Sequence, residues 1–277
     1  MGNRIKLNHM GLSRNSRLFL IAGPCVIPPK SGQKELFQTA QILKDITDEL
    51  GIPFVFKASY DKANRLSHRS YRGPGLKDGL KVLACLKKEF KFHILSDIHS
   101  ISEVKPAAEV LDIIQIPALL CRQTDLVIAA ARTKRVINLK KGQFMAPLDM
   151  KYIAEKVSSC GNHNIILTER GTVFGYHNLV NDMRSIPIMK SIGYPVVYDA
   201  THSVQLPGGG LGKSAGQRDM IKHLAQAGVA AGADGLFLEV HPKPDRALCD
   251  GSNSLALKDL KSLLVKLIGI KSIIDGI

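Results

Sequence analysis

The chain has 277 residues and a formal net charge of +14, with 45% hydrophobic residues, 5% aromatic residues and no Trp. This length is usual for one α/β barrel and short for two independent domains. The few aromatic residues disfavour sites that stack bases or sugar rings, and no apolar run approaches the roughly 20 residues of a membrane-spanning helix. A basic protein attracts anions, and because its Lys and Arg residues are spread along the chain without a nucleic-acid motif, we expect small phosphorylated substrates.

The N-terminal region has Arg14 and Arg17 before the apolar stretch 18–22, which ends close to Cys25. This pattern has some likeness to a signal peptide with a lipidated cysteine, but the stretch is shorter than a signal-peptide core. The number of cysteines is odd, and none of them forms a Cys-x-x-Cys pair, which disfavours a disulfide framework. We therefore expect a cytoplasmic protein.

Short apolar stretches rich in β-branched residues recur along the chain at gaps of roughly 20 to 40 residues. They lie at 18–22, 54–56, 93–95, 113–116, 136–139, 165–167, 195–198 and 235–238. Continuous apolar stretches of this length are typical of parallel strands that are buried on both faces. Helical periodicity lies between them, for example at 35–50, 76–90, 123–131, 150–158, 217–231 and 257–268.

This alternation predicts a single-domain (β/α)8 barrel, the TIM-barrel fold, over residues 18–277. Residues 1–17 are predicted to form a polar extension or a cap that closes the bottom of the barrel. The alternative is an open, doubly wound sheet, which shows the same alternation. No Gly-x-Gly-x-x-Gly motif follows the first strand, so a dinucleotide site has no support.

A polar or reactive residue follows each predicted strand. In chain order these residues are Cys25, Lys57, Asp97, Gln115, Lys140, Arg170, His202 and Glu239. In a barrel, all of these positions meet at one mouth, where active sites are built. A single Lys or Asp after a strand is more often an ordinary surface residue, but one shared binding mouth accounts for the whole set.

Cationic side chains are common at these strand ends and on the loops just beyond them. They are Lys57, Lys62, Arg65, Arg72, Arg122, Lys140 and Arg170. A ring of fixed cations suits carboxylate and phosphate oxygens, because Arg makes planar bidentate contacts and Lys provides a compact charge.

Four further residues form a candidate metal site. Cys25, His202, Glu239 and Asp250 offer one thiolate, one imidazole and two carboxylates, which suits Zn²⁺, Fe²⁺, Mn²⁺ or a similar divalent ion. Their spacing is not a metal motif. However, the first, seventh and eighth strands are neighbours in a closed barrel, and Asp250 lies on the loop after the eighth.

Several segments resemble the 3-deoxy-D-manno-octulosonate-8-phosphate synthase family. They are Ala22-Gly-Pro-Cys25, Phe56-Lys-Ala-Ser-Tyr-Asp-Lys-Ala-Asn-Arg65, Ser70-Tyr-Arg-Gly-Pro-Gly75, Ile116-Pro-Ala118, Cys121-Arg-Gln-Thr-Asp125, Lys140-Lys-Gly-Gln-Phe144, Thr168-Glu-Arg-Gly171, Phe174-Gly-Tyr176, Asp199-Ala-Thr-His-Ser-Val-Gln205 and Glu239-Val-His-Pro242. The resemblance extends over about residues 18–270. The Lys-Ala-Asn-Arg and Lys-Lys-Gly-Gln-Phe segments separate this family from its nearest relative.

The resemblance implies an enzyme that condenses phosphoenolpyruvate with D-arabinose 5-phosphate and water, and so makes a precursor of lipopolysaccharide. It also implies a cytoplasmic homotetramer. Members of the metal-dependent branch have Cys at the position of Cys25, where metal-independent members have Asn. Cys25 therefore indicates a divalent-metal enzyme, whereas the stretch Cys249-Asp250-Gly251 is more similar to metal-independent members.

The resemblance also implies roles for individual residues. The candidate ligands of phosphoenolpyruvate are Lys57, Lys62, Gln115, Lys140 and Arg170, and those of arabinose 5-phosphate are Asn64 and Arg65. The candidate catalytic residues are Lys140, His202, Asp97 and Asp250. Leu66 departs from the family pattern, which has a serine near the aldose phosphate, and we hypothesise that His68 or Arg69 supplies a replacement donor.

Three other functions compete with this one. The related 3-deoxy-arabino-heptulosonate-7-phosphate synthases use erythrose 4-phosphate, but their Lys-Pro-Arg-Thr signature is absent here. A Schiff-base aldolase would use Lys57 or Lys140 as its nucleophile. A non-enzymatic phosphate-binding barrel would not need four candidate metal ligands opposite a ring of cations.

Overall fold

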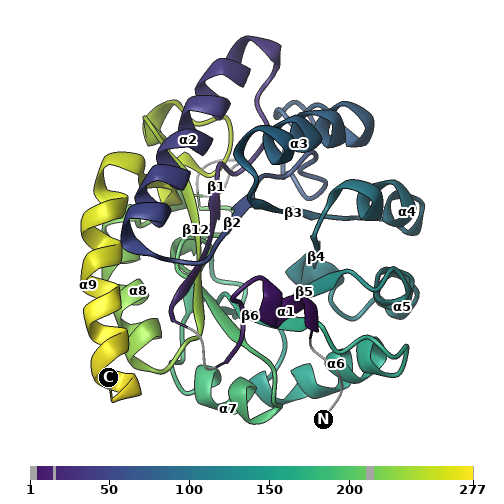
Figure 1. The fold of residues 1–277 in the computed structure, drawn as a ribbon, viewed down its shortest axis with the longest axis vertical. Helices are drawn as coiled ribbons and strands as arrows, with labels where there is room; N and C mark the ends of the chain where they lie inside the picture. The colour runs from purple at the N-terminus through teal and green to yellow at the C-terminus, as the bar shows by residue number, and fades with distance from the viewer. Residues whose placement is uncertain (1–4, 15–16, 210–214, 277) are drawn as a thin grey trace.

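A computed structural model describes residues 5–14, 17–209 and 215–276. In this part of the chain, parallel strands form a closed ring with helices outside it (Figure 1). The barrel strands are β1 Phe19–Gly23, β2 Phe54–Lys57, β3 His93–Asp97, β4 Ile113–Ile116, β5 Val136–Lys140, β6 Ile165–Glu169, β9 Val196–Asp199 and β12 Gly235–His241. Strand β1 pairs with both β2 and β12, so the ring closes and the predicted (β/α)8 barrel is confirmed over the open sheet.

The helices cover the outside of the ring in chain order. They are α2 Gln33–Leu50, α3 Leu76–Phe90, α4 Ile101–Val110, α5 Thr124–Arg132, α6 Met150–Ser158, α7 Ser185–Ser191, α8 Ile221–Ala230 and α9 Leu257–Asp275. The helices at 76–90 and 150–158 begin and end as predicted, whereas α8 is shorter than the predicted 217–231. Helix α4, which contains Pro106, and the short helix α7 are not among the helical segments named from the sequence.

Smaller elements decorate the loops. Short antiparallel pairs join β7 Thr172–Val173 to β8 Leu179–Val180, and β10 Gln205–Leu206 to β11 Ala215–Gly216. The short strand β13 Leu255–Ala256 pairs in parallel with the end of β12. Single 3-10 turns are η1 Lys30–Gly32, η2 Ala118–Leu120, η3 Pro147–Asp149, η4 His202–Val204, η5 Arg218–Met220, η6 Pro244–Arg246 and η7 Gly251–Asn253.

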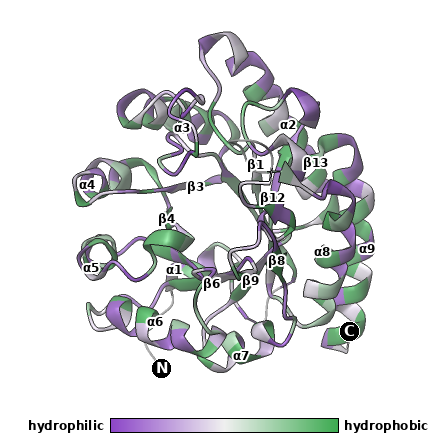
Figure 2. Ribbon diagram, turned by 180° about the vertical axis from the view of Figure 1, so that it is seen from behind, coloured by the Kyte–Doolittle hydropathy of each residue, from purple (hydrophilic) through white to green (hydrophobic). Residues whose placement is uncertain are grey.

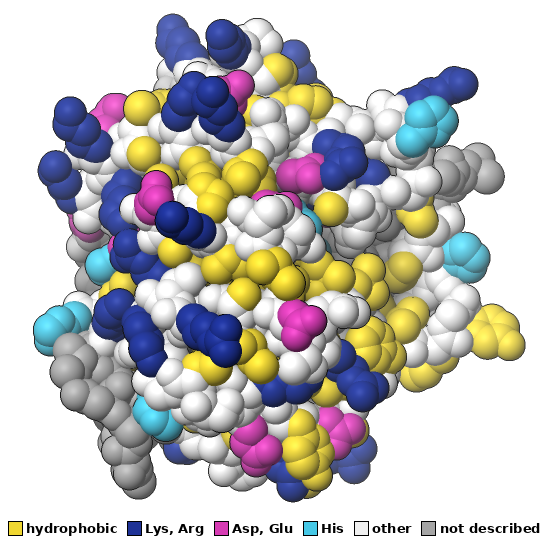
Figure 3. All heavy atoms as spheres, turned by 90° about the vertical axis from the view of Figure 1, so that its right-hand side faces the viewer, with side chains coloured by type: hydrophobic (Ala, Val, Ile, Leu, Met, Phe, Trp, Pro, Cys, Tyr) yellow, Lys and Arg dark blue, Asp and Glu magenta, His cyan; other side chains and the backbone are white. Residues whose placement is uncertain are grey.

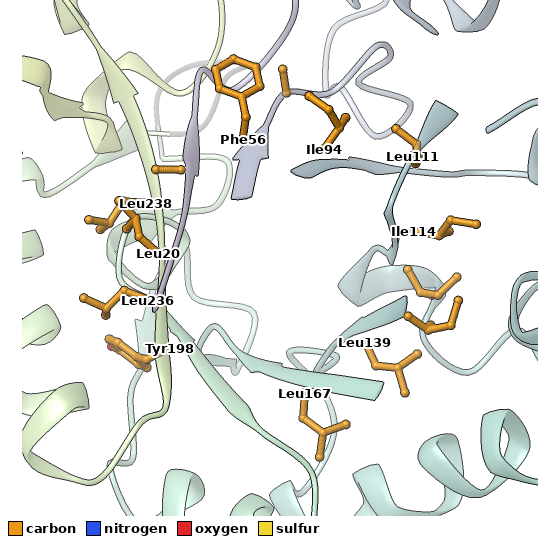
Figure 4. Close-up of a cluster of buried hydrophobic side chains, with 14 of the residues drawn as sticks. Leu20, Phe56, Ile94, Leu111, Ile114, Leu139, Leu167, Tyr198, Leu236 and Leu238 are labelled. Carbon is orange, nitrogen blue, oxygen red and sulfur yellow. The ribbon is translucent and has the colours of Figure 1, made fainter. Parts of the chain in front are cut away.

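The alternation of side chains along each strand separates two cores. Outward-facing residues such as Leu20, Phe56, Leu139 and Leu238 point away from the ring towards the helices (Figure 4). The inward-facing core contains Phe19, Ile21, Val55, Leu95, Ile113, Val136, Ile166, Val197 and Phe237. Because strand side chains alternate with a period of two, the next inward positions towards the mouth carry the polar residues of the candidate site.

Helix α1, Ile5–His9, lies across the near end of the ring in Figure 1. Leu7 and Leu12 are fully buried in the inward-facing core, and Lys6 Nζ donates to the Lys134 carbonyl just before β5 at 2.6 Å. The amino-terminal ends of the strands are therefore covered by this segment. Residues 1–4 and 15–16 of the predicted extension lie outside the described residues.

The outer surface is polar and basic. From behind, the ring helices show hydrophilic and hydrophobic residues alternating along their length (Figure 2). Lys and Arg side chains are scattered over the face shown in Figure 3 and do not form one patch. Among the helices that the structure describes, none is long and apolar enough to cross a membrane.

Replacing Leu7 by alanine is expected to lower the free energy of unfolding by about 2–5 kcal/mol, because a fully buried leucine leaves a cavity at the base of the barrel. Urea denaturation measures the change. Ile273→Ala is the control, since Ile273 on α9 is 79% exposed and its loss should change stability by less than about 0.5 kcal/mol. Equal, small effects of the two substitutions would contradict the packing of α1 against the barrel.

Candidate active site at the barrel mouth

A cavity of about 1210 Å³ opens at the carboxyl ends of the barrel strands. The predicted site residues that line it are Lys57, Lys62, Asn64, Arg65, Asp97, Gln115, Lys140, Arg170, His202 and Asp250. Pockets for a single drug-sized ligand usually measure roughly 300–1,000 Å³, so this cavity has room for two small phosphorylated molecules. Cys25 and Glu239 are both buried, and Cys25 lines a smaller hollow behind the mouth.

Glu239, near the end of β12, is the centre of one buried charge cluster. Its carboxylate accepts a hydrogen bond from Lys57 Nζ, and its Oε1 lies 3.7 Å from Lys62 Nζ and 3.4 Å from His202 Nε2. Burial alone would raise the pKa of Glu239, but the Lys57 ammonium, His202 and Lys62 hold this pKa well below its usual range. Glu239 is therefore ionised, and its Oε2 has no hydrogen-bond partner among the described residues.

Asp199, at the end of β9, organises a second cluster. Its Oδ2 lies 2.5 Å from Lys140 Nζ and 2.7 Å from His202 Nδ1, and its Oδ1 accepts from the His202 backbone N–H at 2.9 Å. Burial opposes ionisation of Asp199, but His202 and Lys140 keep its pKa below the usual range. Lys140 Nζ also sits 3.9 Å from the centroid of the Phe237 ring, so the ammonium is fixed from two sides.

Asp97, at the end of β3, belongs to a third cluster. His99 Nε2 lies 3.0 Å from Asp97 Oδ2, and His99 Nδ1 lies 3.5 Å from Glu103 Oε2, which also accepts from Tyr60 Oη at 2.6 Å. Burial lowers the pKa of His99, but its hydrogen bonds to Asp97 and Glu103 outweigh this and raise the pKa to about 10. His99 is therefore an imidazolium that holds the Asp97 carboxylate at the mouth.

Buried hydrogen bonds link the inward side chains of β4, β5 and β6. Asn138 Nδ2 donates to Gln115 Oε1 at 2.9 Å, and Asn138 Oδ1 accepts from Thr168 Oγ1 at 2.6 Å. Arg170 Nη2 donates to Gln205 Oε1 at 2.5 Å, while its Nη1 is buried without a partner in the described chain. The unpaired guanidinium nitrogen leaves Arg170 a donor for an anion in the cavity.

The loop after β2 forms one wall of the cavity. Arg65 Nη2 donates to the carbonyls of Tyr71 and Leu248 at 3.0 and 2.9 Å, which ties this loop to the one after β12. Leu66 lines the cavity and is 63% exposed. His68 and Arg69 are not among the described residues that line the cavity. The hypothesis that one of them replaces the missing serine therefore gains no support.

The candidate metal ligands fall into two groups that share Asp250. The ligand atoms of His202, Glu239 and Asp250 lie within 4.8 Å of one another, and so do those of Cys25, Cys249 and Asp250. The four predicted ligands thus do not form one group, and Cys249 joins them unexpectedly. Lys57 Nζ donates to the Cys25 carbonyl, at 3.1 Å, and to Glu239, and so contacts one residue of each group.

The donor chemistry fits a divalent ion. Histidine ligands usually donate their second ring N–H to a carboxylate, and the contact between His202 Nδ1 and Asp199 leaves Nε2, which faces Glu239 Oε1 at 3.4 Å, as the nitrogen that could bind an ion. The unpartnered Glu239 Oε2 offers a buried oxygen ligand beside it. Burial, followed by the neighbouring Cys249 and Glu239, raises the pKa of the Cys25 thiol, which must lose its proton on binding an ion.

Sequence reasoning did not single out Asp199, His99 or Cys249 for the site. Asp199 begins the segment that ends at Gln205, and its place directly after an apolar strand was the available signal. His99 stands two residues beyond Asp97, and Cys249 directly precedes Asp250. No spacing rule connects Asp199 to Lys140, or Cys249 to Cys25, because these partners lie far apart in the chain.

Comparison with known proteins gives a consistent result. The DAHP synthetase I family profile matches residues 5–275. A 2-dehydro-3-deoxyphosphooctonate aldolase of Geotalea uraniireducens is 57% identical over 274 residues, which is 99% of this chain and all of the relative. Proteins with the same name from Geobacter sp. strain M21 and Geobacter sulfurreducens are 56% and 55% identical, each over 99% of this chain and all of the relative.

The His99 ring is expected to stay protonated until about pH 10, which NMR of ¹⁵N-labelled histidine can follow. The folded pKa lies above the ordinary value of 6.5, so the stabilisation from this charge is complete below pH 6.5 and is lost as the pH rises through about 10. The stability difference between the native chain and His99→Gln should therefore be larger at pH 6 than at pH 10. A ring that titrates near pH 6.5 would contradict the cluster.

Proposed function

The chain belongs to the DAHP synthetase I family, and from this premise we propose how its barrel mouth works. The chain is an enzyme that joins phosphoenolpyruvate to D-arabinose 5-phosphate and water, giving 3-deoxy-D-manno-octulosonate 8-phosphate and inorganic phosphate. The observation that carries this assignment is the full-length identity of 55–57% to relatives named for the deoxyphosphooctonate. The product serves as a lipopolysaccharide precursor, and we place the reaction in the cytoplasm.

Phosphoenolpyruvate binds among the cations deep in the mouth. Lys57, Lys140 and Arg170 are at most 5% exposed, so their charges are little screened by water. Lys62 and Gln115 complete this subsite from the wall. The unpaired Arg170 Nη1 supports a direct contact with the carboxylate or phosphate, because a buried donor without a partner is costly unless a ligand satisfies it.

Arabinose 5-phosphate binds nearer the rim. Asn64 and Arg65 line the cavity on the loop after β2, and Asn64 is exposed there. The contact of Arg65 with the Leu248 carbonyl places its guanidinium between two loops of the mouth. This position supports an aldose phosphate at the rim with its aldehyde directed towards the buried phosphoenolpyruvate.

The reaction forms a bond between C3 of phosphoenolpyruvate and the aldehyde carbon, while the aldehyde oxygen takes a proton. Water adds at C2, and phosphate leaves. Holding two anions side by side in the correct geometry supplies much of the acceleration, because it replaces a three-body encounter in water. Lys140, fixed by Asp199, stabilises negative charge as it develops. His202 is oriented by the same carboxylate, and Asp97 and Asp250 accept hydrogen bonds from substrate hydroxyl groups or water.

We propose that the enzyme uses a divalent metal such as Zn²⁺, Fe²⁺ or Mn²⁺. Cys25, His202, Glu239 and Asp250 would hold it, and when bound it would orient the aldehyde or lower the pKa of the attacking water. His202 is already oriented for this role by Asp199. Cys25 and Asp250 are in contact, since the thiol lies 3.3 Å from Asp250 Oδ2.

Competing chemistry is less well supported. A Schiff-base aldolase needs a neutral lysine amine, whereas Lys57 is paired with Glu239 and Lys140 with Asp199. The curated relatives cited above carry the octonate name and not that of the erythrose 4-phosphate enzyme. We also propose a homotetramer, which the family resemblance implies. Phe174 and Tyr176, each more than half exposed on the loop after β6, are apolar surface that suits contact with another subunit.

Lys140→Met is expected to lower kcat/KM for phosphate release by about 100-fold or more, since it removes a buried cation from the reacting region. Release is measured from phosphoenolpyruvate in the presence of arabinose 5-phosphate. Lys151→Met on helix α6, at a residue that does not line the cavity, is the control and should retain native activity. Native activity in Lys140→Met would remove Lys140 from the mechanism.

Exhaustive chelation is expected to abolish activity, and added Zn²⁺, Fe²⁺ or Mn²⁺ to restore it. Cys25→Ser should retain at least about 10-fold less metal, because a hydroxyl is a poorer ligand than a thiolate. Cys121→Ser, at a buried cysteine outside both ligand groups, controls for the loss of a thiol. Full activity of the metal-free enzyme would overturn the proposed metal requirement and leave the reaction itself in place.

A further inference from the structure

Cys249 is a buried thiol that faces the candidate metal site. It is 5% exposed, and its Sγ lies 3.2 Å from Asp250 Oδ2. The same carboxylate oxygen lies 3.3 Å from Cys25 Sγ, at a residue that is 6% exposed. Two thiols from distant parts of the chain therefore converge on one carboxylate oxygen.

The separations suit coordination by a single ion. A tetrahedral ion with metal–sulfur bonds of about 2.3 Å places its two sulfur ligands about 3.8 Å apart. The two sulfurs and the carboxylate oxygen all lie within 4.8 Å of one another. These three atoms are therefore close enough together for one ion to contact all of them.

The backbone holds Cys249 and Asp250 in this orientation. Asp250 adopts a left-handed conformation with φ 49°, and a Cβ on Gly251 would meet the Pro244 carbonyl oxygen at 2.3 Å. Arg218 Nη2 donates to the Gly251 carbonyl at 2.6 Å. A strained, tightly fixed turn is typical of a segment that positions functional side chains.

The two sulfurs are also reachable from outside the main cavity. Cys25 and Cys249 line a separate hollow of about 240 Å³, together with Glu35 and His241. Glu35 Oε1 and His241 Nε2 lie 3.6 Å apart there. A metal site needs an entry path, and this hollow gives an ion access to both thiols without passing through the substrate cavity.

We propose that Cys249 is a second sulfur ligand of the divalent ion, in addition to Cys25, His202, Glu239 and Asp250. The inference deepens the proposed metal requirement and rests on it. Asp250 belongs to both ligand groups and so connects the sulfur pair to His202. Two thiolates make the centre selective for thiophilic ions such as Zn²⁺ and Cd²⁺ over Mn²⁺, which prefers oxygen ligands.

Cobalt substitution counts the sulfur ligands directly. Co²⁺ is added without oxygen to the chelated, reduced full-length protein, and the thiolate-to-cobalt absorption in the near ultraviolet is measured per bound ion. This absorption should fall to about half in Cys249→Ser and in Cys25→Ser, and should vanish in the double variant, since each thiolate contributes one bond. Cys121→Ser is the matched control and should keep the native intensity.

Ion selectivity provides a second measurement. In a competition experiment, the ratio of the affinity for Cd²⁺ to the affinity for Mn²⁺ should fall by at least about 10-fold in Cys249→Ser, because one soft ligand is replaced by a hard one. Cys249→Ala distinguishes loss of a ligand from misfolding, provided that its circular dichroism matches the native spectrum. It should show the same loss of absorption.

Native absorption per cobalt and native Cd²⁺ preference in both Cys249 variants would overturn the proposal. Failure to bind Co²⁺ at all would also overturn it, together with the metal requirement. The reaction is tested separately by phosphate release from phosphoenolpyruvate and arabinose 5-phosphate. A chain that binds Co²⁺ through two sulfurs but releases no phosphate would refute the proposed reaction and not the ligand set.

Discussion

The pairing of buried charges inside the barrel is the constraint on which the rest of the site depends. Lys57 with Glu239 and Lys140 with Asp199 join opposite charges that are almost fully removed from water. Each ion would be very costly to bury alone, and removing one partner of such a pair typically costs about 3–5 kcal/mol. These charges give the mouth fixed cations for anionic substrates and an oriented anion beside His202. Function, more than stability, accounts for their burial.

This arrangement divides the interior of the barrel into two layers. The lower layer is apolar, from Phe19 to Phe237, and is covered at the base by Leu7 and Leu12. The upper layer is charged and opens into the cavity. A rigid apolar base is what allows side chains such as Lys140 to be held by an aromatic ring on one side and a carboxylate on the other. Fixed dipoles and charges of this kind need little reorganisation during a reaction.

Much of the fold and part of the site could be predicted from the sequence. The barrel strands are continuous apolar stretches, so their positions were predicted within one or two residues in most cases, with β12 extending three residues further. Helix α4, which contains Pro106, was expected only from the regular alternation of strands and helices. The strand-end residues were found because the barrel topology places them at one mouth. Their pairing was not, since Lys57 and Glu239 are 182 residues apart and only the closure of β1 on β12 brings them together. Cys249 marked a branch of the family in the sequence and became a candidate ligand only through its contact with Asp250.

The central claim is that the barrel mouth joins two phosphorylated substrates through a new carbon–carbon bond. The most direct measurement is ¹³C NMR of the products formed from phosphoenolpyruvate labelled at C3 and unlabelled arabinose 5-phosphate. We predict that the label appears in the eight-carbon sugar acid, bonded to a carbon of the former aldose, and that little product forms when erythrose 4-phosphate is supplied instead. Label recovered as free pyruvate, or an efficient seven-carbon product from erythrose 4-phosphate, would contradict it.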